Sequence, residues 1–252
     1  MPNLALSATA FTHHGAVRAR NEDTIAVDDW VMSESMDQPV TLQRIVERPC
    51  VCLVADGMGG HAAGDVASWF VAECLVERAA EADGGVAVER LLRDIDHALF
   101  ALMRERPALY GMGSTVAGLH IAPAALSVFN VGDSRVYRIE ETGLCQLSTD
   151  DTPGPKLADG RTAAHTTSLL SQALGGEEGP CGITPHVLHE QIDGERRYLI
   201  CSDGLTDELG VEALFGLIEA DDGASATALF QAAMAAGGRD NISIVLARVR
   251  PA

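Results

Sequence analysis

The sequence predicts one α+β domain, in which helices cover a mainly antiparallel sheet. β-rich runs at residues 115–121, 125–131 and 135–140 are separated only by short turns, so no crossover helix fits between them and they must pair antiparallel as a meander. Apolar residues recur at helical spacing after Asp65, the expected cap, and over residues 86–106, which predicts two helices on one face of a sheet. The 252 residues can bury a full core, and no linker divides them.

The other elements follow in chain order from local patterns. Residues 32–49 are polar and mixed, which predicts a loop or a weakly specified hairpin. The segment 148–182 is irregular apart from a short helical pattern at 168–174, and because loops of this length are usually functional, we expect a flap beside a site. Further strands are expected at 4–11, 24–27, 51–55, 197–202 and 242–249, and further helices at 211–219 and 224–236.

Composition and charge narrow the class of partner. The chain is 47% hydrophobic and 21% charged, as in globular proteins, and its formal net charge of −18 argues against nucleic acid or an anionic membrane as the main partner. The six cysteines form no CxxC pair or disulfide framework. Because no signal peptide and no apolar run of about 20 residues is present, we expect a cytoplasmic protein.

Acidic residues recur where predicted strands end or turn. Asp56 follows the apolar run 51–55, and Asp203 follows 197–202 in the same way. One such aspartate is an ordinary turn or cap residue, but several flanked by glycine or asparagine are harder to explain that way. If they meet in space, cations must neutralise their repulsion, and oxygen ligands alone favour Mg²⁺ or Mn²⁺. Two such ions about 3.5–4 Å apart form the clamp used for in-line phosphoryl hydrolysis by a bridging water.

Six segments resemble the motifs of the metal-dependent protein phosphatases, the type 2C serine/threonine phosphatases, in their compact bacterial form. They come in family order and span almost the whole chain. The segments are GAVRARNED (15–23), VADGMGGH (54–61), MGSTV (112–116), NVGDSRVYRI (130–139), CSDGLTDEL (201–209) and GGRDNISIVL (237–246). The resemblance implies a four-layer α-β-β-α sandwich of two mainly antiparallel sheets. It also implies hydrolysis of phosphoserine and phosphothreonine by a water that bridges two divalent ions, without a covalent intermediate.

The resemblance assigns the carboxylates to two metal ions, either Mn²⁺ or Mg²⁺, and to a weaker third site. Asp56 resembles the aspartate that bridges both main ions, with the Gly57 carbonyl as a further ligand. Asp203 and Asp240 are assigned to the first ion, and Glu22 to the second ion, directly or through water, with Asp23 behind Glu22. Asp133, together with Asp203 and Asp207, is assigned to the third ion. Asn241 is assigned to holding Asp240 in place.

Two more residues are assigned to the substrate. Arg18 matches the arginine that grips phosphate, because its spacing to Asp23 fits better than that of Arg20, which we expect to be a solvated neighbour. Eukaryotic members have histidine directly after Asp-Gly, where this chain has Met58. His61, three positions on, is the candidate general acid, since an unperturbed pKa near 6.5 suits proton donation. The alternative is that His61 only packs or hydrogen-bonds its loop and water donates the proton.

The predicted flap departs from the family pattern. Where many relatives carry an Asp-His-Ser type segment, this chain has Asp150, Asp151 and Thr152. The resemblance therefore does not define the substrate-facing surface of this chain. Compact flaps of this kind resemble those of phosphatases that partner a serine/threonine kinase in bacterial protein-secretion control. The expected partners are therefore phosphoproteins and a cognate kinase, and we expect a monomer.

Two other functions were weighed against a phosphatase of this family. A catalytically silent relative would bind phosphoprotein or metal as a regulatory module, but silent relatives typically lose an aspartate or the phosphate arginine, and none is missing here. A phosphatase that forms an aspartyl-phosphate needs a nucleophilic aspartate two residues before a second one. Position 201, two residues before Asp203, is cysteine, which excludes that chemistry.

Overall fold

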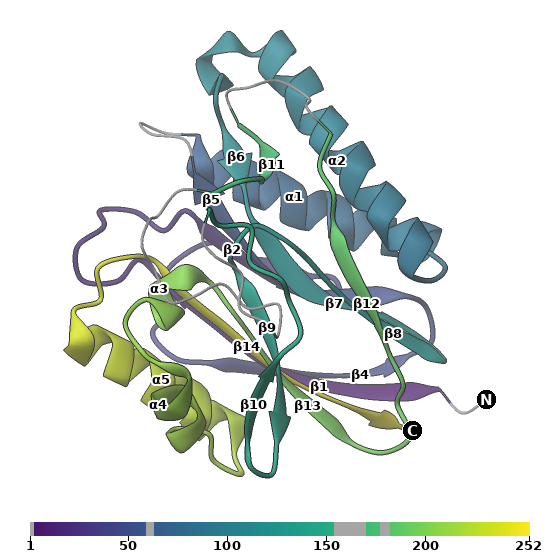
Figure 1. Ribbon diagram of the computed structural model, residues 1–252, viewed down its shortest axis with the longest axis vertical. Helices are drawn as coiled ribbons and strands as arrows, with labels where there is room; N and C mark the ends of the chain where they lie inside the picture. The colour runs from purple at the N-terminus through teal and green to yellow at the C-terminus, as the bar shows by residue number, and fades with distance from the viewer. Residues whose placement is uncertain (1–2, 59–62, 154–169, 177–181) are drawn as a thin grey trace.

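The computed structural model describes residues 3–58, 63–153, 170–176 and 182–252, and in them two β-sheets pack back to back with helices on both outer faces (Figure 1). Every strand pairing within these residues is antiparallel. The predicted α-β-β-α sandwich is therefore confirmed.

The first sheet has six strands and is built around the N- and C-terminal strands of the chain. In sheet order they are β10 (Gly143–Gln146), β9 (Arg135–Glu140), β13 (Arg196–Cys201), β14 (Ile242–Pro251), β1 (Leu4–His13) and β4 (Val40–Val46). β1 and β14 pair over their whole length, from Leu4 opposite Pro251 to His13 opposite Ile242. This long pair fixes where β14 begins, just after Asp240.

The second sheet has eight strands and contains the apolar run that ends in Asp56. In sheet order they are β11 (Leu174–Gly175), β6 (Gly113–Ser114), β5 (Cys50–Met58), β7 (Val116–Ala122), β8 (Ala125–Val131) and β12 (His186–Glu190), with β2 (Asp23–Val27) paired to β5 and to β3 (Trp30–Met32). β5 is paired with β2 on one side and with β7 on the other, and it is buried on both faces. The apolar run 51–55 predicts such a doubly buried strand.

Helices cover the outer face of each sheet. The second sheet carries α1 (Gly64–Arg78), η1 (Ala79–Glu81), α2 (Gly85–Glu105) and η2 (Pro107–Leu109), and the first carries α3 (Asp203–Thr206), α4 (Val211–Gly216) and α5 (Asp222–Ala236) (Figure 1). One apolar cluster lies between each sheet and its helices, and a third, which includes Leu6, Val54 and Val245, fills the space between the two sheets. No helix in the described residues is long and apolar enough to cross a membrane.

The structure corrects the expected meander. β7 and β8 form a hairpin, but β9 leaves β8 after Gly132 and Asp133 and joins the other sheet beside β13. The outer neighbour of β8 is β12 instead, which the sequence analysis did not predict. The Asp133 turn therefore lies where the chain crosses between the two sheets.

Three local expectations are also wrong. Residues 40–46, expected to be loop or a weak hairpin, form β4 against β1. The helix pattern at 168–174 has no helix in its described part, residues 170–174, where Leu174 starts β11. Asp65 is not the cap of α1, which begins at Gly64 after Ala63; the Asp65 carboxylate accepts a hydrogen bond from the Val66 amide within the first turn.

Candidate active site

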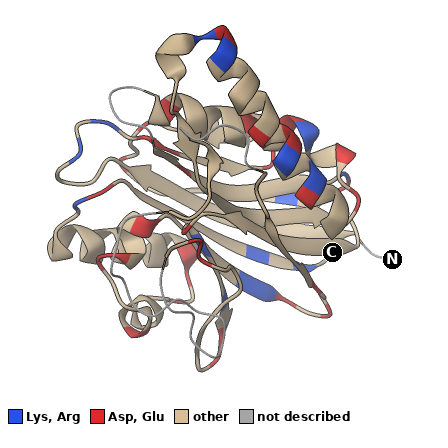
Figure 2. Cartoon of the chain, turned by 45° about the horizontal axis from the view of Figure 1, so that its top comes forward, with Lys and Arg blue, Asp and Glu red and all other residues tan. Residues whose placement is uncertain are grey.

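Acidic residues from separate segments lie at one end of the two sheets, at or beside strand ends (Figure 2). In the second sheet, Asp23 lies directly opposite Asp56 across the β2–β5 pair. In the first sheet, the last residue of β13, Cys201, lies opposite Ile244 and Arg135, which brings the segments after β13, before β14 and before β9 together. The remaining acidic positions are Glu22 just before β2, Asp133 in the turn between β8 and β9, Asp203 at the start of α3 and Asp240 just before β14.

Asp23 joins the two sheets at this end. Its side chain is fully buried, and its Oδ2 accepts hydrogen bonds from Ser202 Oγ at 2.8 Å and Ser243 Oγ at 2.6 Å. Burial raises the pKa of Asp23 to about 7, although the two hydroxyl groups act in the opposite direction. Its Oδ1 has no hydrogen-bond partner among the described residues. Asp23, which lies in the second sheet, is thus hydrogen-bonded to Ser243 of the first sheet and to Ser202, directly after β13 of that sheet.

Asp56 and Asp203 are the centre of the cluster. Burial raises the pKa of Asp56 well above its ordinary value, and the charges of Asp23, Asp203, Asp133 and then Asp240 add to the shift. Burial also raises the pKa of Asp203 to about 6, with further contributions from Asp240 and Asp207, while a hydrogen bond with the Asp56 carboxyl lowers it. Oδ1 of Asp203 is buried and has no partner among the described residues.

Asp133 belongs to the same electrostatic group. Burial, together with the nearby charges of Asp203 and Asp150, raises the pKa of Asp133 to about 7. Asp207 lies one turn beyond Asp203, because its amide donates to the Asp203 carbonyl at 2.7 Å. Asp133 and Asp207, the predicted third-site residues, therefore each lie near Asp203.

Asp240 is paired with the predicted phosphate-binding arginine. Nη2 of Arg18 lies 2.6 Å from Asp240 Oδ2, and both side chains are partly exposed. The other oxygen, Oδ1, accepts a hydrogen bond from the Asn241 amide at 2.8 Å. Arg20, expected to be a solvated neighbour, is exposed.

Asn241 does more than hold Asp240. Its Nδ2 donates to the carbonyls of His14 and Arg20, at 3.1 and 2.9 Å, and its Oδ1 accepts from the Glu22 amide at 2.8 Å. These three bonds fix both ends of the loop that carries Arg18. One side chain therefore positions the loop between β1 and β2 relative to the start of β14.

Glu22 lies where two glycines let the backbone come close. The Gly57 amide donates to the Glu22 carbonyl at 3.1 Å. A Cβ on Gly57 would lie 2.1 Å from the Gly64 carbonyl oxygen, and a Cβ on Gly64 would lie 3.1 Å from Glu22 Cδ. Burial raises the pKa of Glu22, with Asp65 the next cause. Only glycine fits at these positions. The Glu22 carbonyl therefore lies at the end of β5, and its carboxyl group lies against Gly64 at the start of α1.

The donor set fits divalent cations. The described residues contain no group of three or more histidine, cysteine or acidic side chains already arranged to hold an ion. However, two buried carboxylate oxygens, on Asp23 and Asp203, have no hydrogen-bond partner there, and desolvated carboxylates that repel one another are stabilised by a cation. All the donors are oxygens, which Mg²⁺ and Mn²⁺ prefer. His61 lies outside the described residues.

Sequence reasoning missed the serines that hold Asp23. Ser202 and Ser243 are fully buried and lie at the ends of β13 and β14 that meet the acidic cluster. A signal was present, because each serine follows or precedes an apolar run and sits next to or near a motif aspartate. A buried hydroxyl needs a partner, and here the partner is a carboxylate in the other sheet.

Comparisons with known proteins agree with this geometry. Residues 37–237 match the family model described as Protein phosphatase 2C. The chain is 33% identical over 257 residues to the serine/threonine protein phosphatase PstP of Mycobacterium tuberculosis, covering 98% of this chain and 45% of that protein. It is 27% identical over 251 residues to the serine/threonine phosphatase stp of Listeria welshimeri, covering 93% of this chain and 92% of that protein. The chain thus spans less than half the length of PstP.

A solved structure adds a likeness in three dimensions. The catalytic domain of serine threonine protein phosphatase PstP, in complex with 2 manganese ions, superposes with a TM-score of 0.79 at 32% identity, covering 98% of this chain and 99% of that chain. The motifs, the sandwich and these matches lead to one conclusion: the chain belongs to the protein phosphatase 2C family.

Proposed function

We propose that this chain is a metal-dependent phosphatase that hydrolyses phosphoserine and phosphothreonine in proteins. The observation that carries the proposal is the group of desolvated carboxylates at one end of the sandwich, with the buried Oδ1 of Asp203 unpartnered among the described residues and Arg18 beside Asp240. Family membership supports the reaction class, and the names of the relatives support the substrate class.

The proposal gives the acidic residues to divalent ions. Asp56, the Gly57 carbonyl, Asp203, Asp240 and Glu22 would hold two ions, either Mn²⁺ or Mg²⁺, and the manganese complex of PstP supports the count. Asp133 and Asp207, with Asp203, would hold a weaker third. When bound, two divalent ions acidify a water molecule and neutralise charge on the phosphate, chemistry that makes a covalent enzyme intermediate unnecessary.

The residues of the chain bind and orient the substrate. Arg18 would donate two parallel hydrogen bonds to phosphate oxygens from its planar guanidinium group. Asn241 supports this role, because it fixes the ends of the loop that carries Arg18. The buried Asp23, held by Ser202 and Ser243, would keep β2 and Glu22 in place against the first sheet.

His61 remains the candidate general acid for the leaving serine or threonine oxygen. Its alternative, a packing role with water as the proton donor, makes a different prediction. If His61 is the acid, His61→Ala should slow hydrolysis of phosphopeptides far more than that of p-nitrophenyl phosphate, whose leaving group needs little protonation. Equal losses on the two substrates would favour the packing role.

The proposal extends to the biological setting. We take residues 1–252 as one catalytic domain that acts as a monomer in the cytoplasm. Residues 154–169 and 177–181 of the expected flap, 148–182, lie outside the described residues. Its partners would be phosphoproteins and a cognate serine/threonine kinase, with protein-secretion control as one setting. A pull-down of phosphoproteins by the inactive Asp203→Asn variant would identify substrates.

The direct test is an assay on phosphothreonine peptides with added Mn²⁺, with and without chelator. The wild type should release phosphate only when the ion is present. Asp56→Asn and Asp203→Asn should each abolish turnover while leaving the circular dichroism spectrum intact. Turnover that survives the chelator, or near-normal turnover of both variants, would overturn the proposal.

A further inference from the structure

The buried carboxylate of Asp151 accepts three hydrogen bonds from three separate segments. Its Oδ2 accepts from the Gly132 amide at 2.9 Å and from Gln172 Nε2 at 2.7 Å, and its Oδ1 lies 2.8 Å from His186 Nε2. Its backbone adds two more bonds, donating to the Gly132 carbonyl at 3.0 Å and accepting from the Ser171 amide at 2.7 Å. Both oxygens of the carboxylate are therefore in use.

On one side, Asp151 fixes the turn that carries Asp133. It bonds both the amide and the carbonyl of Gly132, the residue just before Asp133. Gly132 has a φ of +101°, and a Cβ there would lie 2.6 Å from Thr115 Cβ, so only glycine fits at this position of the turn. Asp151 makes two hydrogen bonds to Gly132, and Asn130 Nδ2 donates a third to the Gly132 carbonyl at 3.3 Å.

The contacts continue from this turn to Asp56. Ser134 Oγ lies 2.7 Å from Thr115 Oγ1, and Thr115 Oγ1 accepts from the Asp56 amide at 3.3 Å. The Thr115 amide in turn donates to the Asp56 carbonyl at 2.9 Å. An unbroken path of contacts thus runs from Asp151, through the Asp133 turn, to the aspartate at the end of β5.

On the other side, Asp151 holds residues 171–172 and 184–186. Gln172 bonds the Thr184 backbone twice, with Nε2 donating to the carbonyl at 3.0 Å and Oε1 accepting from the amide at 2.9 Å. His186, the first residue of β12, completes the connection to Asp151. These residues lie around β11 and β12, on the side of the molecule away from Asp23.

The adjacent Asp150 makes different contacts from Asp151, so the contacts of Asp151 are not a general feature of this segment. Asp150 takes the Arg135 guanidinium through both of its oxygens and also accepts from Gln146. Within the described residues, its hydrogen-bond partners lie on β9 and β10. Asp151 instead hydrogen-bonds the Asp133 turn together with Ser171, Gln172 and His186, in addition to the backbone pairing of β12 with β8 that places His186 opposite Asn130.

We propose that Asp151 is a positioning residue of the active site, which couples ion binding at Asp133 to the packing of residues 171–172 and 184–186. The proposal rests on the proposed function, because it takes Asp133 as an ion ligand. Coupling is reciprocal: if a bound ion at Asp133 tightens the packing of these residues, loosening that packing must weaken ion binding by the same factor.

The sharpest variant is Gln172→Ala, because Gln172 touches no acidic residue of the site except through Asp151. In Mn²⁺ titrations followed by calorimetry, Asp133→Asn should remove the weakest binding step of the wild type. Asp151→Ala should weaken that same step about tenfold, and Gln172→Ala several-fold. In hydrogen exchange, the amides of Ser171 and Thr184 should exchange faster in Asp151→Ala and in Gln172→Ala than in the wild type. Added Mn²⁺ should slow the exchange of these amides in the wild type only.

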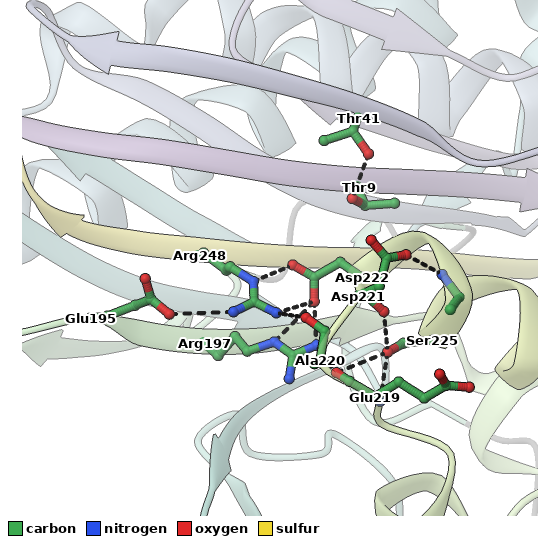
Figure 3. Close-up of polar contacts among 11 residues, drawn as sticks. Thr9, Thr41, Glu195, Arg197, Glu219, Ala220, Asp221, Asp222, Ser225 and Arg248 are labelled. Carbon is green, nitrogen blue, oxygen red and sulfur yellow. Dashed lines mark hydrogen bonds and ion pairs between the residues drawn. The ribbon is translucent and has the colours of Figure 1, made fainter.

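Asp222→Ala is the matched control. Asp222 is as buried as Asp151, and it binds Arg248 and Arg197 at the start of α5 (Figure 3). Arg248 lies six residues beyond Ile242, the first residue of β14, which is about 20 Å from the Asp240 end of the strand at the usual rise. Asp222→Ala should lower the unfolding temperature without changing any Mn²⁺ step. Asp151→Asn should lose less than Asp151→Ala, because its amide oxygen can still accept from Gly132 and Gln172.

The possible failures are distinguishable. A wild type that binds no Mn²⁺ would refute the proposed function and this proposal together. A wild type that binds ions, with unchanged affinities in Asp151→Ala and Gln172→Ala, would refute the coupling alone. Equal weakening in Asp222→Ala would show that the loss follows from general destabilisation and would also overturn the proposal.

Discussion

Asp23 and Asp56 lie directly opposite each other across β2 and β5, two carboxyl groups on neighbouring strands at the end of a buried pair. Like charges at such positions destabilise a sheet, and burial makes the repulsion stronger. The pKa of both groups is raised, that of Asp23 to about 7, with burial the first cause in each case. The Asp23–Asp56 pair therefore lowers the stability of the folded protein without ions, and it lies where the family resemblance places the metal ions.

Divalent ions should therefore stabilise the folded protein. At a free Mn²⁺ concentration 100 times the dissociation constant, binding to the native state alone adds about 2.7 kcal/mol, or about 5–10 °C in the unfolding temperature of a chain of this size. Differential scanning calorimetry with Mn²⁺ and with chelator measures the shift. Asp56→Asn should be at least as stable as the wild type in chelator and should lose most of the shift. An equal shift in that variant would contradict the assignment of Asp56.

The raised pKa values predict how stability depends on pH without ions. A carboxyl whose pKa is higher in the folded state stabilises the protein at pH below its unfolded value, and this contribution is lost as the pH rises through the folded value. For Asp23 and Asp133 the folded value is about 7, and for Asp203 about 6, so the loss falls between about pH 4 and 7.

The variant Asp23→Asn isolates one of these groups. Asparagine can still accept from Ser202 and Ser243 but carries no charge, so its stability relative to the wild type should increase from pH 5 to pH 8 in chelator. Urea unfolding at the two pH values measures the difference. A difference that is the same at both pH values would contradict a raised pKa for Asp23.

Arg18 should act on substrate binding more than on turnover. Charge-assisted hydrogen bonds contribute about 1.5–3 kcal/mol, so Arg18→Ala should raise KM for a phosphopeptide about 10- to 100-fold and change kcat less. The assay needs saturating Mn²⁺, because Arg18 also pairs with Asp240. Arg20→Ala is the control, since that side chain is exposed, and it should leave KM near the wild-type value. An unchanged KM for Arg18→Ala would argue against a phosphate-binding role.

The elements that the sequence predicted well are those with a strong local pattern. β5 contains the apolar run 51–55 and β13 the apolar run 198–201, each of which leads to a carboxylate, and both strands appear where expected. β4 could not be found in this way, because Arg44 occupies an inward position that the alternation reserves for apolar residues. Its guanidinium reaches Asp28 and Asp29, and the strand is specified by its pairing with β1.

Long-range contacts explain the other differences. β9 follows β8 closely and was expected to pair with it, but it pairs with β13, about 60 residues later in the chain. The motif residues can be picked out of the sequence one at a time, but the hydrogen bonds between distant segments that bring them together cannot. Asn241 bonds His14 across 227 positions, and no local pattern predicts such a contact.

Gly204 tests how closely α3 and the start of β14 must approach. A Cβ at this position would lie 2.0 Å from the Asn241 carbonyl oxygen and 3.2 Å from Asp240 Cβ, and the nearer atom is backbone that cannot move aside alone. Gly204→Ala should therefore lower the free energy of unfolding by about 2 kcal/mol or more and displace Asp240, which weakens Mn²⁺ binding. Urea unfolding and calorimetric titration measure the two effects. Gly143→Ala is the matched control, because a Cβ there would meet nothing within 4 Å, and it should change neither quantity. A Gly204→Ala protein with wild-type stability would show that the contact between α3 and the Asp240 segment is not needed.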